Sequence, residues 1–257
     1  MISKTELKYF SSLLKKKFRD EGKKFIIEGK KIVEEALNSK YFCEIILVSN
    51  DFYEQNSDFI KILIKKKYGI EIIRNQDFKK ISETVTPQEI VAVLRQHKDE
   101  KLNEKNLNPF IIYLENISDP GNLGTIIRTC DWFGIDTLLL SENTAELYNP
   151  KVIRSSMGSI FHLNIFRDIK LSEIEKLKSK GYKFICSDLD GMDIYSFHLP
   201  KKLILFFCNE SYGPSPELLS MSDEKITIPR KGKAESLNVA SASAIILSEL
   251  TRKIPIT

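Results

Sequence analysis

The stretch ITIPRKGKAESLNVASASAIILSEL, residues 226–250, has the pattern of a strand end, a basic loop and a long apolar helix. The strand is expected to end at Ile228, and the helix to span 237–252. Ser236 and Asn238 lie at the start of this helix, where a polar side chain ordinarily caps the first turn. A strand, loop and helix in this order predict an α/β fold, in which ligands bind beyond the carboxyl ends of the strands.

A second stretch of this kind is LILFFCNESYGPSPELL, residues 203–219. Its apolar run predicts a strand buried on both faces. Asn209 and Glu210 follow the strand directly, and Gly213 lies in the turn after them. A carboxylate at this place can orient a ligand or cap the next helix, so both interpretations stay open.

The third stretch is ENISDPGNLGTIIRTCDWFG, residues 115–134. An Asp-Pro-Gly turn is expected to precede a helix, with Asn122 as its N-cap. Arg128 falls on the side of this helix opposite the apolar stripe. Taken alone, such an arginine is more often a solvated charge than a functional residue.

The whole chain is predicted to form two α/β domains. Residues 1–97 alternate between helical and strand-like patterns, 98–108 are a polar linker, and 109–257 form a second α/β series. The first helix keeps its apolar residues Leu7, Phe10, Leu14 and Phe18 at helical spacing. In the second domain, FIIYL and LILFF predict central parallel strands. Its strands are expected at 110–114, 137–140, 163–166, 183–186, 203–207 and 225–228.

Positive charge is concentrated at the N-terminus. Residues 1–31 hold ten Lys and Arg against four acids, a net charge of +6, whereas the whole chain carries +4. A basic cluster of this kind fits nucleic-acid phosphates, although a solvated lysine face is an equally ordinary explanation.

Several functional classes receive no support from the sequence. The four cysteines form no CxxC pair, and the three histidines have no metal-ligand spacing, so no metal site is expected. GxGxxG and GxxxxGK[ST] phosphate loops are absent. With neither a membrane-spanning run nor a signal peptide in the sequence, a cytoplasmic protein is expected.

Taken in order, the three stretches closely resemble the three motifs of the SpoU (TrmH) family of RNA ribose 2'-O-methyltransferases. The resemblance covers roughly residues 108–252 and implies a SPOUT catalytic domain with a parallel sheet and a C-terminal trefoil knot. It also implies S-adenosylmethionine as the methyl donor and a homodimer. FIIEGKKIVEEAL, residues 25–37, is similar to the start of the ribosomal-protein-like α/β domain that binds RNA in such proteins.

The family pattern implies five catalytic positions: Asn122, Arg128, Glu210, Ser236 and Asn238. We expect the asparagines and the serine to orient the ribose and the arginine, and Glu210 to organise the site. The family's arginine is often assigned as the base. Since an arginine side chain stays protonated, we expect Arg128 to anchor a phosphate and stabilise the developing alkoxide.

The resemblance also implies how the methyl donor is held. Backbone groups at Cys208, Ile228 and Leu237 would contact it, with Leu237 facing the adenine. Neighbouring residues Asn209, Gly213 and Pro229 would shape the pocket. Cys208 stands where many members have glycine, so its side chain must point into the core to leave the donor room.

Structured RNA is the expected substrate, with ribosomal RNA favoured over transfer RNA because an extra domain with a basic start suits folded RNA. Ser155, Ser156 and Gly158 are expected on the substrate side. The alternative is an RNA-binding or assembly protein of the same fold that has lost catalysis. Calorimetry with S-adenosylmethionine distinguishes the two.

Overall fold

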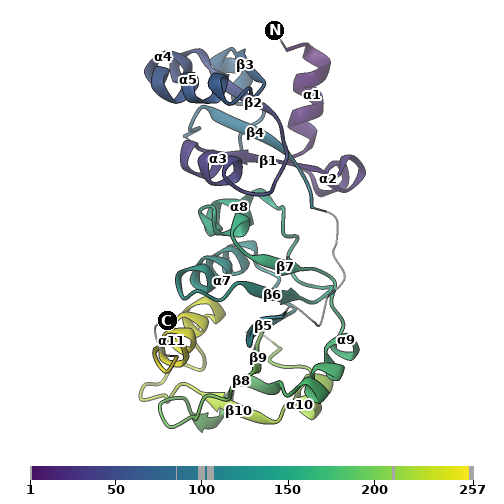
Figure 1. The fold of residues 1–257 in the computed structure, drawn as a ribbon, viewed down its shortest axis with the longest axis vertical. Helices are drawn as coiled ribbons and strands as arrows, with labels where there is room; N and C mark the ends of the chain where they lie inside the picture. The colour runs from purple at the N-terminus through teal and green to yellow at the C-terminus, as the bar shows by residue number, and fades with distance from the viewer. Residues whose placement is uncertain (1, 85, 98–101, 103–106, 210–211, 255–257) are drawn as a thin grey trace. The chain divides into compact units, whose positions relative to one another are not determined.

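The computed structural model divides into two compact units, drawn in Figure 1. Met1–Lys98 and Glu146–Phe161 form the first unit, and Asp99–Ala145 and His162–Thr257 form the second. The structure describes residues 2–84, 86–97, 102, 107–209 and 212–254. Glu210 and most of the expected linker therefore lie outside the described residues. No helix within them is long and apolar enough to cross a membrane.

The first unit contains a four-stranded sheet in the order β1-β4-β2-β3. β4 is antiparallel to both β1 and β2, whereas β2 and β3 are parallel. The strands are β1 (Lys24–Glu28), β2 (Cys43–Ser49), β3 (Ile70–Ile73) and β4 (Ile90–Arg95). The helices of this stretch are α1 (Lys4–Ser12), α2 (Lys16–Gly22), α3 (Lys30–Leu37), α4 (Asn50–Gln55), α5 (Ser57–Lys65) and α6 (Asn75–Phe78). This is the α/β unit expected for the first hundred residues.

The expectation of a single helix at the N-terminus is wrong, because the structure has two helices there, α1 and α2, with a break between them. The carbonyls of Leu13 and Leu14 at this break accept hydrogen bonds from Arg19 Nη1, at 2.9 and 2.7 Å. The Arg19 side chain is only 2% exposed, and its Nε donates to Glu146 Oε1 at 2.9 Å. A buried guanidinium thus satisfies the backbone groups that a continuous helix would have paired.

Residues 146–161, which the sequence analysis assigned to the second domain, belong by their contacts to the first unit. The Tyr148 ring stacks on Phe25 with 4.4 Å between centroids, and Phe161 meets Tyr41 edge-on at 5.2 Å. These aromatic contacts join α8 (Pro150–Ser156) and the 3-10 turn Ser159–Phe161 to the first unit.

The expectation that Ser156 lines the substrate side is wrong. Its side chain is fully buried, and its hydroxyl donates to the carbonyl of Ile153 at 2.9 Å. Gly158, with a φ of 100°, lies against Glu35, since a Cβ there would come within 2.7 Å of the Glu35 Cγ. The roles of Ser156 and Gly158 in the described structure are therefore local packing and turn formation.

The second unit contains a six-stranded, fully parallel sheet in the order β10-β8-β9-β5-β6-β7. The two strands expected in the centre, β5 (Phe110–Glu115) and β9 (Leu203–Cys208), are neighbours there and are buried along their whole length. The other strands are β6 (Thr137–Leu140), β7 (Asn164–Phe166), β8 (Lys183–Asp193) and β10 (Glu224–Thr227). All six expected strands are confirmed.

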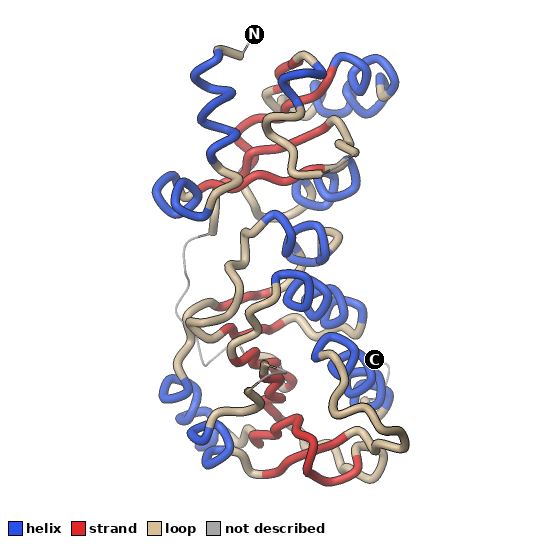
Figure 2. Tube along the Cα trace, turned by 180° about the vertical axis from the view of Figure 1, so that it is seen from behind, coloured by secondary structure: helices blue, strands red, loops and turns tan. Residues whose placement is uncertain are grey.

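Helices cover both faces of this sheet. α7 (Pro120–Trp132) and α11 (Val239–Arg252) pack together on one face, and α9 (Leu171–Glu175) and α10 (Pro216–Met221) lie on the other, with the turn Lys176–Lys180 (Figures 1 and 2). The parallel arrangement brings the carboxyl ends of β5, β9 and β10 toward the same edge, where the three polar stretches follow them.

Candidate functional site

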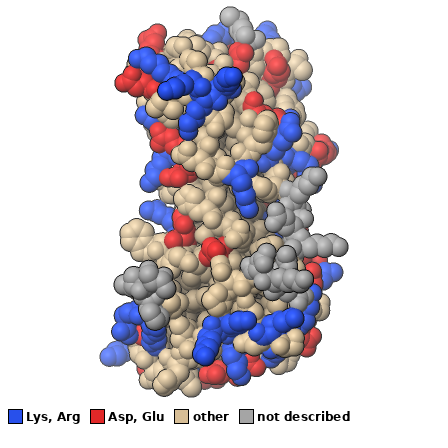
Figure 3. Space-filling view, in the orientation of Figure 1, with Lys and Arg blue, Asp and Glu red and all other residues tan. Residues whose placement is uncertain are grey.

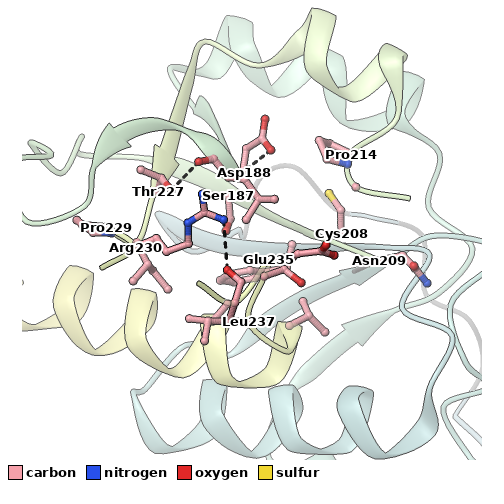
Figure 4. A pocket seen from close by; sticks show the side chains of 18 of the residues that line it. Ser187, Asp188, Cys208, Asn209, Pro214, Thr227, Pro229, Arg230, Glu235 and Leu237 are labelled. Atoms are coloured by element: carbon pink, nitrogen blue, oxygen red, sulfur yellow. Dashed lines mark hydrogen bonds between the residues drawn. The ribbon is translucent and has the colours of Figure 1, made fainter. Parts of the chain in front are cut away.

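A cavity of about 570 Å³ opens beyond the carboxyl ends of β9 and β10 (Figure 4). This volume falls in the range of small-molecule sites, and the walls are mainly apolar with a few polar groups. Segments far apart in sequence meet here. Seven of the residues predicted for the site line it: Ser236 of the expected catalytic set and, from the expected donor-binding set, Cys208, Asn209, Gly213, Ile228, Pro229 and Leu237.

Cys208, the last residue of β9, contributes to both the cavity and the core. Its side chain is 8% exposed and packs in the cluster that contains Phe206 and Cys186. Contact with the Cys186 thiol, together with burial, raises the pKa of Cys208, so its thiol stays protonated. Its backbone does not have the positive φ that would call for glycine. The cysteine therefore fits where many family members have glycine.

Asn209 connects the second polar stretch to the first. Its Nδ2 donates to the carbonyl of Asn116 at 3.1 Å and to the hydroxyl of Ser118 at 3.3 Å. Its own carbonyl accepts from the backbone N–H of Gly213, whose φ of 63° turns the chain back toward the cavity. These bonds fix the loop that precedes α7.

Glu115 is a site-supporting residue that the sequence analysis missed. It ends β5 with only 5% exposure, and its carboxylate accepts from the backbone N–H of Ser215 at 2.9 Å and from the Ser215 hydroxyl at 2.6 Å. Ser215 in turn caps α10. The carboxylate therefore anchors Ser215, which directly follows the cavity-lining residues Tyr212, Gly213 and Pro214. An acid directly after the apolar run FIIYL was the available signal.

Asn238 connects the third polar stretch to the first. As N-cap of α11, its Oδ1 accepts from the backbone N–H of Ala240 at 3.0 Å. Its Nδ2 donates to Asn122 Oδ1 at 3.1 Å. Both ends of the Asn238 amide are therefore fixed, and the start of α11 is joined to the first turn of α7 beside the cavity.

The expectation that Asn122 caps α7 is wrong. Asp119 caps the helix, accepting from the backbone N–H of Asn122 at 2.9 Å, because Pro120 takes the first helical position. The Asn122 side chain is thus available for Asn238. Arg128 lies exposed further along α7 and does not line the cavity. Within the described part of the chain, it has no hydrogen bond or ion pair.

A bulge in β8 forms another wall that the sequence analysis did not assign. The pairing of β8 with β10 shifts between Lys225 and Ile226, and the intervening residues of β8 leave the ladder. Ser187, Asp188 and Leu189 of this bulge line the cavity. Asp188 Oδ2 accepts from Lys225 Nζ at 3.3 Å, which ties the bulge to β10. The expected strand ended at Cys186, before the bulge, and Gly191 was the available signal, since a Cβ there would come within 2.7 Å of the Lys225 backbone.

Metal chemistry has no visible site in the described residues, which contain no group of three or more His, Cys, Asp or Glu side chains able to hold an ion.

Comparison with known proteins decides the family. A model described as the SpoU rRNA Methylase family matches residues 109–248, and a model described as an MRM3-like substrate binding domain matches residues 4–92. The chain belongs to the SpoU rRNA methylase family. This confirms the resemblance drawn from the three motifs, and the six-stranded parallel sheet is the SPOUT sheet of that family.

Several relatives and solved structures match this chain along nearly its whole length. The 23S rRNA (guanosine(2553)-2'-O)-methyltransferase RlmP of Bacillus subtilis (strain 168) is 33% identical over 248 residues, 95% of each chain. The SpoU methyltransferase AviRb of Streptomyces viridochromogenes, solved in complex with the cofactor AdoMet, is 25% identical with a TM-score of 0.88 over 98% of each chain. An AdoMet-bound rRNA methyltransferase of Sinorhizobium meliloti is 26% identical with a TM-score of 0.85, covering 100% of this chain and 98% of that one.

Proposed function

We propose that this protein transfers a methyl group from S-adenosylmethionine to a ribose 2'-hydroxyl of ribosomal RNA. The observation that carries the proposal is the cavity that the second and third polar stretches line together, with the first stretch joined to them by the Asn122–Asn238 and Asn209–Asn116 hydrogen bonds. RlmP, to which the chain is similar over almost all its length, is named for this reaction on 23S rRNA.

The residues of the cavity fit the methyl donor. Leu237, Ile228 and Val239 offer apolar surface to a purine ring, and the backbone after β9 offers hydrogen-bonding groups. When bound, S-adenosylmethionine supplies a methyl group on a sulfonium, and the neutral thioether left after transfer is a good leaving group. The protein must then chiefly align the acceptor oxygen and assist removal of its proton.

The catalytic roles follow from position and charge. Asn122 and Asn238 hold each other beside the cavity, so they can present amide groups to a ribose in a fixed orientation. Ser236 lines the cavity directly before Leu237 and is assigned to the same task. Arg128, exposed and permanently charged, binds a phosphate of the RNA and stabilises the developing alkoxide. We retain Glu210 as an organising residue on the family pattern alone.

The first unit is assigned to RNA binding. Lys15, Lys16 and Lys23 are exposed at its basic N-terminal stretch, and none has an ion pair in the described structure. Arg19 is excluded from this role, because its guanidinium is buried and paired with Glu146. On the face drawn in Figure 3, Lys and Arg are interspersed with acids, so we expect scattered phosphate contacts.

Three further features belong to the proposal through the family: a homodimer that uses α11, a trefoil knot in the C-terminal stretch, and a cytoplasmic location. The small and apolar residues of α11 suit close packing of this kind.

The test is a map of 2'-O-methylated riboses in RNA from cells with and without the protein. We expect a ribosomal RNA position to lose its methyl group in the deletion and to regain it when purified protein and S-adenosylmethionine are added to the extracted RNA. If a methyl group is lost in transfer RNA alone, the substrate is transfer RNA and not ribosomal RNA. An unchanged map in both RNAs would reject it.

A further inference from the structure

Arg230 places a guanidinium inside the cavity. It lies in the basic loop after β10, and its Nη1 donates to the carbonyl of Ala234 at 3.2 Å, which closes the loop on itself. Figure 4 shows the side chain reaching from this loop into the cavity. In the described part of the chain, no other hydrogen bond or ion pair is formed by Arg230. A guanidinium has five N–H donors, so most of its donors are left for a ligand.

The groups around Arg230 favour a flat ring over a small anion. Leu189, Ile228 and Leu237 line the cavity together with it, and all three are apolar. The carboxylate of Asp188 already accepts hydrogen bonds from Lys225 Nζ and from the backbone N–H of Leu189. Arginine stacks well on aromatic rings, because its guanidinium is planar and weakly hydrated.

The two ends of the cavity differ in chemistry. Figure 4 shows Asn209 across the cavity from Arg230, and the Asn209 Nδ2 donates to the Asn116 carbonyl of the first polar stretch. The adenosine half of S-adenosylmethionine ends in an uncharged ring. The methionine half ends in an ammonium, which a guanidinium repels, next to a carboxylate, which it attracts, so the choice between the halves rests on the apolar residues that line the cavity with Arg230.

We propose that the Arg230 guanidinium covers the adenine ring of bound S-adenosylmethionine and makes the adenosine half the recognised part of the donor. This rests on the proposed function, since it assumes that the cavity holds this donor. Leu237 faces the ring from just before the N-cap of α11 and Arg230 from the start of the loop after β10, so the ring lies between an apolar and a cationic surface.

The experiment measures the affinity of three ligands by calorimetry: S-adenosylmethionine, its decarboxylated form, and 5'-methylthioadenosine, which lacks the amino acid. We expect Arg230→Ala to weaken S-adenosylmethionine and 5'-methylthioadenosine by the same factor, about tenfold. The ratio of affinities between S-adenosylmethionine and its decarboxylated form should stay as in the wild type. Arg230→Lys should recover only part of the loss, because an ammonium does not stack as a plane.

Lys233→Ala is the matched control, since Lys233 is a cation of the same loop that does not line the cavity. It should leave all three affinities unchanged. Loss of S-adenosylmethionine affinity without loss of 5'-methylthioadenosine affinity would assign Arg230 to the carboxylate and overturn the inference. Loss of RNA affinity alone would assign it to a phosphate and also overturn it. Absence of donor binding in the wild type would reject the proposed function as well, which distinguishes the two failures.

Discussion

The side-chain amide of Asn238 donates a hydrogen bond to Asn122 Oδ1 at 3.1 Å, joining two residues that are 116 positions apart in the chain. One belongs to the first turn of α7 and the other caps α11. The bond therefore joins two helix starts at the edge of the donor cavity, and it holds both amides at fixed positions. Catalysis by alignment depends on such fixed groups.

Asn238→Ser separates the two tasks of this residue. A serine caps α11 nearly as well as an asparagine, so we expect the free energy of unfolding to change by less than about 0.5 kcal/mol. Its hydroxyl is too short to reach Asn122, so the methyl transfer rate should fall roughly a hundredfold. Rates on ribosomal RNA and urea unfolding curves measure the two effects. A variant that keeps the full rate would show that the Asn122 bond is dispensable.

Arg128→Ala should reduce methyl transfer by roughly a thousandfold while leaving fold and donor affinity nearly intact. The side chain is exposed, has no partner in the described structure and does not line the cavity, so its removal disturbs no visible contact. Single-turnover rates and calorimetry with S-adenosylmethionine check the two halves of this statement. Arg128→Lys is the control for charge. Equal activity in the alanine variant would remove Arg128 from the mechanism.

Arg19→Met should lower the free energy of unfolding by about 3 to 5 kcal/mol, because it leaves Glu146 unpaired and the Leu13 and Leu14 carbonyls without their donor. Lys17→Met is the matched control. Lys17 and Glu21 form an exposed ion pair in the same helix, so losing this pair should lower the free energy of unfolding by less than about 1 kcal/mol. Urea unfolding followed by circular dichroism measures both. Equal effects of the two substitutions would contradict a structural role for the buried arginine.

Cys208→Gly should not improve donor binding, although many family members have glycine there. The cysteine has ordinary backbone geometry and a buried side chain. Glycine would add backbone freedom and remove core contacts, at a cost of about 2 kcal/mol in unfolding free energy. Calorimetry with S-adenosylmethionine and thermal unfolding check this, with Cys208→Ala as the control for side-chain loss. A several-fold gain in affinity in the glycine variant would show that the thiol crowds the donor.

Local sequence patterns predicted the framework of the second unit well. FIIYL and LILFF are apolar on both sides, which only central strands of a parallel sheet accommodate, and they form β5 and β9. Asn209 after β9 and Ser236 before α11 line one cavity, because parallel strands end at one edge of the sheet.

Other features depend on tertiary contacts that no local pattern encodes. The break between α1 and α2 needs the Arg19 guanidinium, whose own place depends on Glu146, 127 positions away. The role of Glu115 is visible only when Ser215 is seen against it. The β8 bulge arises from pairing with β10 beyond Cys186, where the expected strand ended.

A calorimetric titration of the purified chain with S-adenosylmethionine tests the central claim most directly. If the cavity lined by the second and third polar stretches is a donor site, heat should be released with a stoichiometry of one donor per chain. No heat from a folded, monodisperse sample would contradict a methyl-donor cavity at this edge of the sheet.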